Sequence, residues 1–192
     1  MRSKLRAFLL SLLFAGMPSG WAAENIPTLH AKVTYPVLQE LMGGCSLRCA
    51  FFWETIAGAP SKPAPQLCDD DAMTGWMAPE DWKNTTITFQ LPSKLPADCR
   101  DTPFYGLSIA NGMIESPRAF RSHARVRSML LSLNKKPIAR LRLADTWKWQ
   151  DFRFNDQVLN QGDVITLTIE EIYPGTESTK PFITEIVLQG AH

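Results

Sequence analysis

The sequence has almost no excess of charge of either sign. It carries 20 Lys and Arg residues against 19 Asp and Glu residues, without a long basic run. Because nucleic acid is bound chiefly through clustered positive charge, no nucleic-acid partner is expected. Internal repeats and low-complexity tracts are also missing, and 192 residues suit a single globular domain.

Long apolar runs are scarce as well. The run from Ala7 to Met17 follows three basic residues and precedes small residues ending at Ala23. This order is typical of a secretory signal peptide, and the apolar part is too short to span a bilayer as a helix. We therefore expect residues 1–22 to be removed. The mature chain is expected to be periplasmic or secreted, without a transmembrane segment.

Residues that could form a catalytic triad are few. The three histidines are His30, in a segment expected to be loose, His123 and the terminal His192. Ser122 and Ser128 lie near His123, but no Gly-x-Ser-x-Gly motif marks either of them as a nucleophile. A hydrolytic triad is therefore not expected.

Paired carboxylates are no better placed for catalysis. Glu170 and Glu171 are adjacent in a segment that alternates as a strand does. Side chains of successive strand residues point to opposite faces, which does not suit an acid–base pair. We therefore expect a binding module and not an enzyme.

Four cysteines remain after the predicted signal peptide: Cys45, Cys49, Cys68 and Cys99. In an oxidising compartment an even number favours two disulfides, for which three connectivities are open. We favour Cys45–Cys49 with Cys68–Cys99. A zinc site is the rival interpretation, but the spacing of three residues between Cys45 and Cys49 and the absence of a nearby His favour disulfides.

Short segments with alternating apolar and polar residues fill the rest of the chain. Ile165, Leu167 and Ile169, for example, alternate with threonines, which is the period of a half-buried strand. Turns rich in Pro, Gly and Asn separate these segments, so the pattern predicts an antiparallel sandwich or barrel. The strand after Pro181 is expected to return to the same sheet. The predicted strands lie near residues 86–91, 105–110, 126–133, 139–143, 152–154, 164–172 and 183–188.

The N-terminal part looks different from the sandwich segments. Residues 35–42 are a short helix candidate, with Pro36 at its start and two glycines after it. We therefore expect residues 23–44 to form an N-terminal extension and residues 45–192 to form one sandwich domain.

Several motifs, in order along the chain, resemble one family. They are Gly-Cys-Ser-x-x-Cys at 44–49, Ile-Ala-Asn-Gly-Met at 109–113, His-Ala-Arg-Val-Arg at 123–127, Ile-Tyr-Pro-Gly-Thr at 172–176 and Ile-Thr-Glu-Ile at 183–186. Together they resemble the bacterial NAD glycohydrolase translocation domain, a branch of the discoidin, or coagulation factor 5/8 type C, sandwiches. Met113 and His123 depart from the Tyr and Asn usual there.

The resemblance implies an all-β fold: an antiparallel β-sandwich, discoidin-like and galactose-binding-like, here with a short N-terminal helical segment. It also implies a glycan-binding module. In the streptococcal toxin that gives the family its name, the glycohydrolase is a separate domain, so the resemblance implies no NADase activity for this chain.

Candidate ligand-binding residues come from two sources. The family motifs supply Asn111, Arg125 and Asp145, and three tryptophans in or beside loops supply aromatic faces for sugar C–H surfaces: Trp82, Trp147 and Trp149. Structural alternatives stand beside these roles. The pair at 111–112 can simply form a turn, Arg125 and Asp145 can form a structural ion pair, and Trp147 and Trp149 can pack at a strand edge. A further tryptophan, Trp76, is expected in the core.

An acidic stretch from Asp69 to Trp76 resembles the Asp-Gly-Asp-x-x-Thr-x-Trp loop of discoidin-like domains, with Asp70 in place of Gly. In sugar-binding relatives this loop holds a structural Ca²⁺ together with a glutamate near the C-terminus. The counterparts here are Asp69, Asp71, Thr74 and Glu185, whose oxygen atoms suit Ca²⁺. Capping of a turn by the aspartates is the equal alternative.

We therefore predict non-catalytic recognition of a glycan or another cell-envelope component, with no organic cofactor. A protein partner or an inhibitory target remains the alternative. A glycan site should have exposed aromatic side chains beside converging polar groups, whereas a protein-binding face should be flatter and more apolar.

Overall fold

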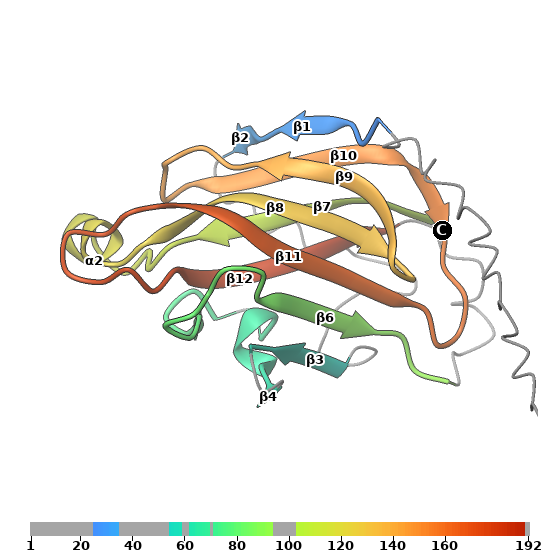
Figure 1. Cartoon of the computed structure of the whole chain (residues 1–192), viewed down its shortest axis with the longest axis horizontal. Coiled ribbons are helices and arrows are strands. Elements are labelled where there is room, and N and C mark those ends of the chain that lie inside the picture. Colours follow the sequence, from blue (N-terminus) through green and yellow to red (C-terminus); the bar gives the residue numbers. More distant parts are fainter. Residues whose placement is uncertain (1–24, 35–53, 59–61, 70, 94–102, 191–192) are drawn as a thin grey trace, which may run out of the picture.

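The computed structural model describes residues 25–34, 54–58, 62–69, 71–93 and 103–190 (Figure 1). The predicted signal peptide and helix 35–42 lie outside these residues. Within the described part, no helix has the length and apolar character needed to cross a membrane.

Two sheets face each other and confirm the predicted all-β sandwich (Figure 1). Among the strands in the described ranges, every pair is antiparallel except β1 with β9. Sheet A has the order β1-β9-β8-β11-β6-β3-β4, and sheet B has the order β2-β10-β7-β12-β5. The strands of sheet A are β1 (Thr28–His30), β3 (Glu54–Ala57), β4 (Lys62–Pro63), β6 (Thr86–Gln90), β8 (Arg125–Leu133), β9 (Lys136–Arg142) and β11 (Val164–Tyr173). Those of sheet B are β2 (Lys32–Thr34), β5 (Trp76–Met77), β7 (Pro103–Asn111), β10 (Trp149–Val158) and β12 (Phe182–Gly190).

The core follows from the alternation of the strands. Ile165, Leu167 and Ile169 of β11 are fully buried, whereas the threonines between them are half-buried on the outer face. The facing strands bring apolar residues of the same period, so the two layers close over one cluster of side chains. Trp76 belongs to this cluster and is 7% exposed, which confirms its predicted place in the core.

The last two strands do not share a sheet, contrary to the sequence prediction. β11 lies at the middle of sheet A and β12 in sheet B, so the segment between Tyr173 and Phe182 crosses from one layer to the other. Backbone N–H groups of this loop bind the carbonyl oxygens of Arg121 and Ser122 at 3.0 Å. The loop is thus longer than a tight hairpin and is fixed to a neighbouring segment instead.

The expected N-terminal extension is partly inside the sandwich. Residues 28–30 pair in parallel with residues 140–142 of β9, and residues 32–34 pair with residues 149–151 of β10. One short segment therefore lies along an edge strand of each sheet. His30 belongs to this segment, so the prediction that it lies in a loose region was wrong.

Three loops gather at one end of the sandwich, at the left of Figure 1. One contains the short helix α2 (Pro117–Ser122), capped by Ser116, whose side chain accepts a 3.1 Å hydrogen bond from the Ala119 N–H. The others connect β9 to β10 and β11 to β12. We call this region the α2 end. A separate 3₁₀ turn, η1 (Pro65–Leu67), follows β4.

Candidate functional site

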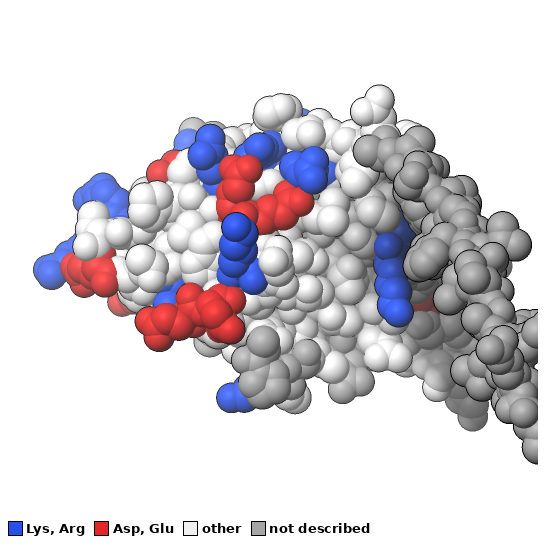
Figure 2. All heavy atoms as spheres, viewed as in Figure 1, with Lys and Arg blue, Asp and Glu red and all other residues white. Residues whose placement is uncertain are grey.

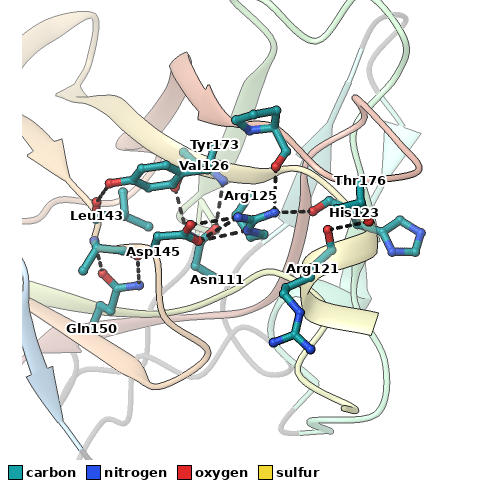
Figure 3. A network of polar contacts seen from close by, with 12 residues as sticks. Asn111, Arg121, His123, Arg125, Val126, Leu143, Asp145, Gln150, Tyr173 and Thr176 are labelled. Atoms are coloured by element: carbon teal, nitrogen blue, oxygen red, sulfur yellow. Dashed lines mark hydrogen bonds and ion pairs between the residues drawn. The ribbon is translucent and has the colours of Figure 1, made fainter. Parts of the chain in front are cut away.

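A buried arginine connects the loops of the α2 end (Figure 3). The side chain of Arg125, at the start of β8, is 7% exposed. Its Nε and Nη2 atoms donate three hydrogen bonds of 2.9–3.0 Å to the Asp145 carboxylate, and Nη1 donates to the carbonyl oxygens of His123 and Pro174 at 2.8 and 2.9 Å. The guanidinium carbon lies 5.0 Å from the centre of the Phe120 ring. Every N–H donor of this guanidinium therefore has a partner.

Two buried amide side chains complete the network (Figure 3). Asn111 donates to the Val126 carbonyl oxygen at 2.8 Å and accepts from the Val126 N–H at 3.0 Å. Gln150 likewise donates to the Ala144 carbonyl oxygen at 3.1 Å and accepts from the Ala144 N–H at 2.6 Å. Each amide thus replaces a strand partner at a point where the chain leaves the ladder, and each fixes the start of a loop.

These contacts decide between the alternatives for the motif residues. Asn111 is fully buried, and Arg125 is saturated with internal partners. The ligand-binding role predicted for both is therefore corrected to a structural one, because neither side chain has a free polar group that faces solvent. Asp145 differs, since its side chain is 43% exposed although it binds Arg125. It lies at the rim of the α2 end.

The three candidate tryptophans are not together. Trp147, in the β9–β10 loop, is 45% exposed. Trp149 begins β10, pairs with Thr34 and Ala110 in the ladder, and is half-buried. Trp82 packs against the core from the segment before β6. Only Trp147 has the exposure that a stacking surface requires, and it follows Asp145 by two residues.

A cavity of about 320 Å³ opens beside the same loop. The cavity could not be predicted from the sequence, because its walls come from four separate strands, the segment between β1 and β2 and the start of the β9–β10 loop. The alternating arginines of β9 and the tyrosine of the Tyr-Pro-Gly motif were the only signals. It is lined by His30, Ala31, Arg127, Arg142, Leu143, Ala144 and Tyr173.

The outer face of sheet A carries a charged cluster next to this cavity. Figure 2 shows side chains of both signs lying side by side over β8, β9 and β11. Arg140 donates to both oxygens of Glu170 at 2.7 and 3.0 Å, and Ser128 adds a third bond at 3.0 Å. The bonds from Arg140 hold the pKa of Glu170 below its usual range, although partial burial acts in the opposite direction. The same pairing raises the pKa of Arg140.

Glu171 lies on the same outer face, which corrects the prediction that it points away from Glu170. The register of β11 against β8 shifts on both sides of Glu171, and this bulge turns the second glutamate outward. Glu171 accepts a 2.6 Å hydrogen bond from Arg142, which lowers its pKa. Both glutamates are thus held as carboxylates, and neither is poised to act as a general acid.

The predicted calcium residues do not gather into a site in the described structure. Asp69 accepts hydrogen bonds from the Thr74 hydroxyl at 2.8 and 3.0 Å and from the Asp71 N–H, while Asp71 accepts from the Met73 N–H at 2.9 Å. Glu185, in β12, is 2% exposed. No group of three or more His, Cys, Asp or Glu among the described residues is arranged to hold a metal ion. The loop oxygens form a turn, and the binding of Ca²⁺ by these residues stays a prediction.

The cysteine predictions concern mostly undescribed positions. Cys68 is buried and disulfide-bonded. Cys45, Cys49 and Cys99 lie outside the described residues, so the pairing of Cys68 with Cys99, like that of Cys45 with Cys49, stays a prediction.

His123 lies beside Ser122, but the pair is a local contact. Nδ1 of His123 is 2.9 Å from the Ser122 hydroxyl, which also donates to the Ala119 carbonyl oxygen at 2.9 Å. Ser122 is 7% exposed at the end of α2. The hydroxyl therefore completes the end of the helix.

The fold and the loops of the α2 end define a discoidin-like β-sandwich. The family model for the NAD glycohydrolase translocation F5/8 type C domain matches residues 64–189, and the chain belongs to that family. The matched range contains the Arg125 network and the loops that it connects.

Other comparisons add little. Thirteen chains of solved structures match. One is a mutant form of the arabinofuranosyltransferase AftD from Mycobacteria, with 15% identity over 68% of this chain and a TM-score of 0.41. This chain covers only 10% of that protein's length, and a likeness at this level carries no argument. Comparison with curated proteins gives no match.

Proposed function

We propose that this chain is a non-catalytic carbohydrate-binding module of the periplasm or the secreted fraction, and that it holds its glycan at the α2 end. The observation that carries this proposal is the exposed indole of Trp147 on a loop that buried polar contacts fix in place. Aromatic faces bind the C–H surfaces of sugars, and a loop on a rigid sandwich is where such a residue is useful.

Polar groups for the sugar hydroxyls lie on the same loop. Asp145 keeps 43% of its side chain exposed, and Ala144 and Leu143 lead directly into the cavity wall. Because Arg125 already anchors Asp145, little side-chain entropy is lost when the carboxylate accepts a hydroxyl. A concave surface beside an exposed aromatic residue matches the expectation for a glycan site better than that for a flat protein-binding face.

The charge state of the nearby acids supports a role without catalysis. Glycoside hydrolysis needs one protonated and one ionised carboxyl group. The arginine partners of Glu170 and Glu171 keep the pKa of both groups low. In this proposal, glycan binding does not require Ca²⁺. The proposed location in the periplasm or the secreted fraction rests on the signal-peptide pattern at the N-terminus of the sequence.

A glycan array tests the proposal when wild type is compared with Trp147→Ala, each with and without EDTA. We expect binding to a defined set of glycans, loss of that binding in Trp147→Ala, and no effect of the chelator. Val158→Ala is the matched control, because Val158 is 57% exposed at the far end of β10. Equal binding by wild type and Trp147→Ala would refute the choice of Trp147.

A protein partner is the outcome to consider if no glycan binds. Large exposed apolar side chains among the described residues are scattered over different elements: Val33, Met73, Met77, Trp147 and Val158. This scatter gives no apolar face of the kind that protein interfaces use. A blank array would nevertheless reject carbohydrate binding.

A further inference from the structure

The cavity beside the α2 end contains two guanidinium groups that converge on one oxygen atom. Oε2 of Glu171 is 2.6 Å from Nη1 of Arg142 and 3.7 Å from Nε of Arg127. Both arginines line the cavity. The two positive groups are therefore close enough to bind a single carboxylate, and Glu171 shows where such an anion lies.

Glu171 does not satisfy all the hydrogen-bond donors of Arg127 and Arg142. By comparison, Arg140 makes two hydrogen bonds to Glu170. Arg127 is 54% exposed and reaches the shared Glu171 oxygen only at 3.7 Å, which is an ion-pair distance and not a hydrogen bond. Two guanidiniums thus face one carboxylate at the mouth of the cavity, and planar guanidinium groups favour bidentate contact with carboxylates.

The remaining walls suit a sugar ring. Tyr173 lines the cavity, and its hydroxyl donates to the Leu143 carbonyl oxygen at 3.0 Å, which fixes the ring. The Arg127 guanidinium lies 5.6 Å from the centre of that ring. Ala31 and Leu143 supply apolar surface, and His30 adds a further hydrogen-bonding group. The volume of about 320 Å³ is at the small end of ligand pockets, as a single sugar unit requires.

We propose that this cavity binds the carboxylate of an acidic sugar unit, a uronic acid, through Arg127 and Arg142. This inference rests on the proposed glycan binding and specifies the ligand class for the adjoining cavity. The sugar carboxylate competes with Glu171 for the two guanidiniums, while the ring lies against Tyr173. Affinity should therefore respond in opposite directions to loss of an arginine and to loss of the internal carboxylate.

The test is an NMR titration of the full protein with glucuronate, glucose and inorganic phosphate, followed through the backbone amides of residues 143, 144 and 173. We expect glucuronate to bind at least about fivefold more tightly than glucose. Arg127→Gln should weaken glucuronate binding about fivefold, as expected for one partly exposed charged contact. Glu171→Gln should strengthen it, because both guanidiniums become available.

Arg153→Gln is the matched control. Arg153 is exposed on sheet B, where its guanidinium lies 4.2 Å from the centre of the Tyr105 ring. The substitution removes the same charge as Arg127→Gln, but at a residue that does not line the cavity. Equal weakening by Arg153→Gln and Arg127→Gln would overturn the inference. The inference would also be overturned if Glu171→Gln bound glucuronate more weakly than wild type does, or if phosphate bound more tightly than glucuronate.

Failure of this inference can be told from failure of the proposed function. If the array shows glycan binding that depends on Trp147 but does not distinguish acidic from neutral sugars, the proposed function stands and the acidic subsite is rejected. If no glycan binds on the array and glucuronate binds no more tightly than phosphate, the cavity is a general anion site, which overturns the inference as well.

Discussion

Two arginine–carboxylate pairs lie at the same end of this sandwich and differ in almost every physical respect. Arg125 is 7% exposed and uses all its donors on Asp145 and two carbonyl oxygens from different loops. Arg142 is 33% exposed and shares the 43% exposed Glu171 with Arg127. In the first pair the arginine is enclosed by the protein and only the carboxylate reaches solvent, whereas in the second pair both partners are partly exposed beside a cavity.

The difference distinguishes residues that hold the loops of the α2 end in place from residues that can bind a ligand there. Breaking a buried pair leaves a charge without water or a partner, which is costly, whereas an exposed pair contributes little to stability. The Arg125 network therefore fixes the loops. The exposed arginines and Trp147 remain able to exchange an internal or solvent contact for a ligand.

Asp145→Asn should have the largest effect on stability. It leaves the buried Arg125 guanidinium without its countercharge, so we expect the free energy of unfolding to fall by about 3 kcal/mol. The estimate is at the low end for such pairs because Asp145 is itself half-exposed. Urea denaturation measures the loss, and a change below about 1 kcal/mol would mean that Arg125 is not dependent on this partner.

Gly175→Ala should come next, because it disturbs the same loops without touching a charge. A Cβ atom at this position would lie 2.5 Å from the carbonyl oxygens of Ser122 and Ser178, and backbone atoms cannot move aside as a flexible side chain can. We expect a loss of about 2 kcal/mol, in the range for overpacking. Gly162→Ala is a control for the steric effect, because no atom lies within 4 Å of a Cβ atom at that position. Its φ of +78° makes alanine strained there, so this variant reports backbone strain without a clash in thermal denaturation. An unchanged melting temperature in Gly175→Ala would contradict the close approach.

Glu170→Gln should have a smaller, pH-dependent effect. The pKa of Glu170 is lowered from its ordinary 4.5 by the hydrogen bonds from Arg140. The carboxylate therefore stabilises the fold at pH values above 4.5, and this contribution is lost as the pH falls through the lowered pKa. At pH 7 we expect Glu170→Gln to lose about 1 kcal/mol, since the pair is partly exposed. The two proteins should approach each other in stability in strong acid, and a difference that does not depend on pH would exclude this ionisation as its source.

Glu80→Gln should have the smallest effect and sets the baseline for the comparison. Its carboxylate lies 3.2 Å from the Lys180 ammonium, but the Glu80 side chain is 81% exposed. Solvent screens such a pair, so we expect less than about 0.5 kcal/mol by urea denaturation. A loss of unfolding free energy as large as that of Asp145→Asn would show that burial does not determine how much these ion pairs stabilise the fold.

Local patterns in the sequence predicted the fold well. The alternation in β6, β9 and β11 identified the strands, because one face of each strand packs on the core. The partner sheet of β12 could not be predicted in the same way, since alternation reports a buried face and not which neighbour supplies it. The edge strands β1 and β2, with three residues each, are too short to show a period.

The candidate site was predicted less well, for two physical reasons. Asn111 and Arg125 stand in motifs, and the motifs identify residues that hold loops together as readily as residues that bind ligands. The cavity could not be read from the sequence, because His30 and Tyr173 meet only when β1 joins sheet A beside β9. A bulge in β11, invisible to simple alternation, also brought Glu171 to the outer face.

The most direct test is calorimetric titration of the array-selected glycan into wild type, Trp147→Phe and Trp147→Ala. A stacking role predicts that Trp147→Phe, which keeps an aromatic face, binds within about threefold of wild type, while Trp147→Ala binds at least about tenfold more weakly. Unchanged affinity in Trp147→Ala would contradict the claim that the α2 end receives the glycan on this residue.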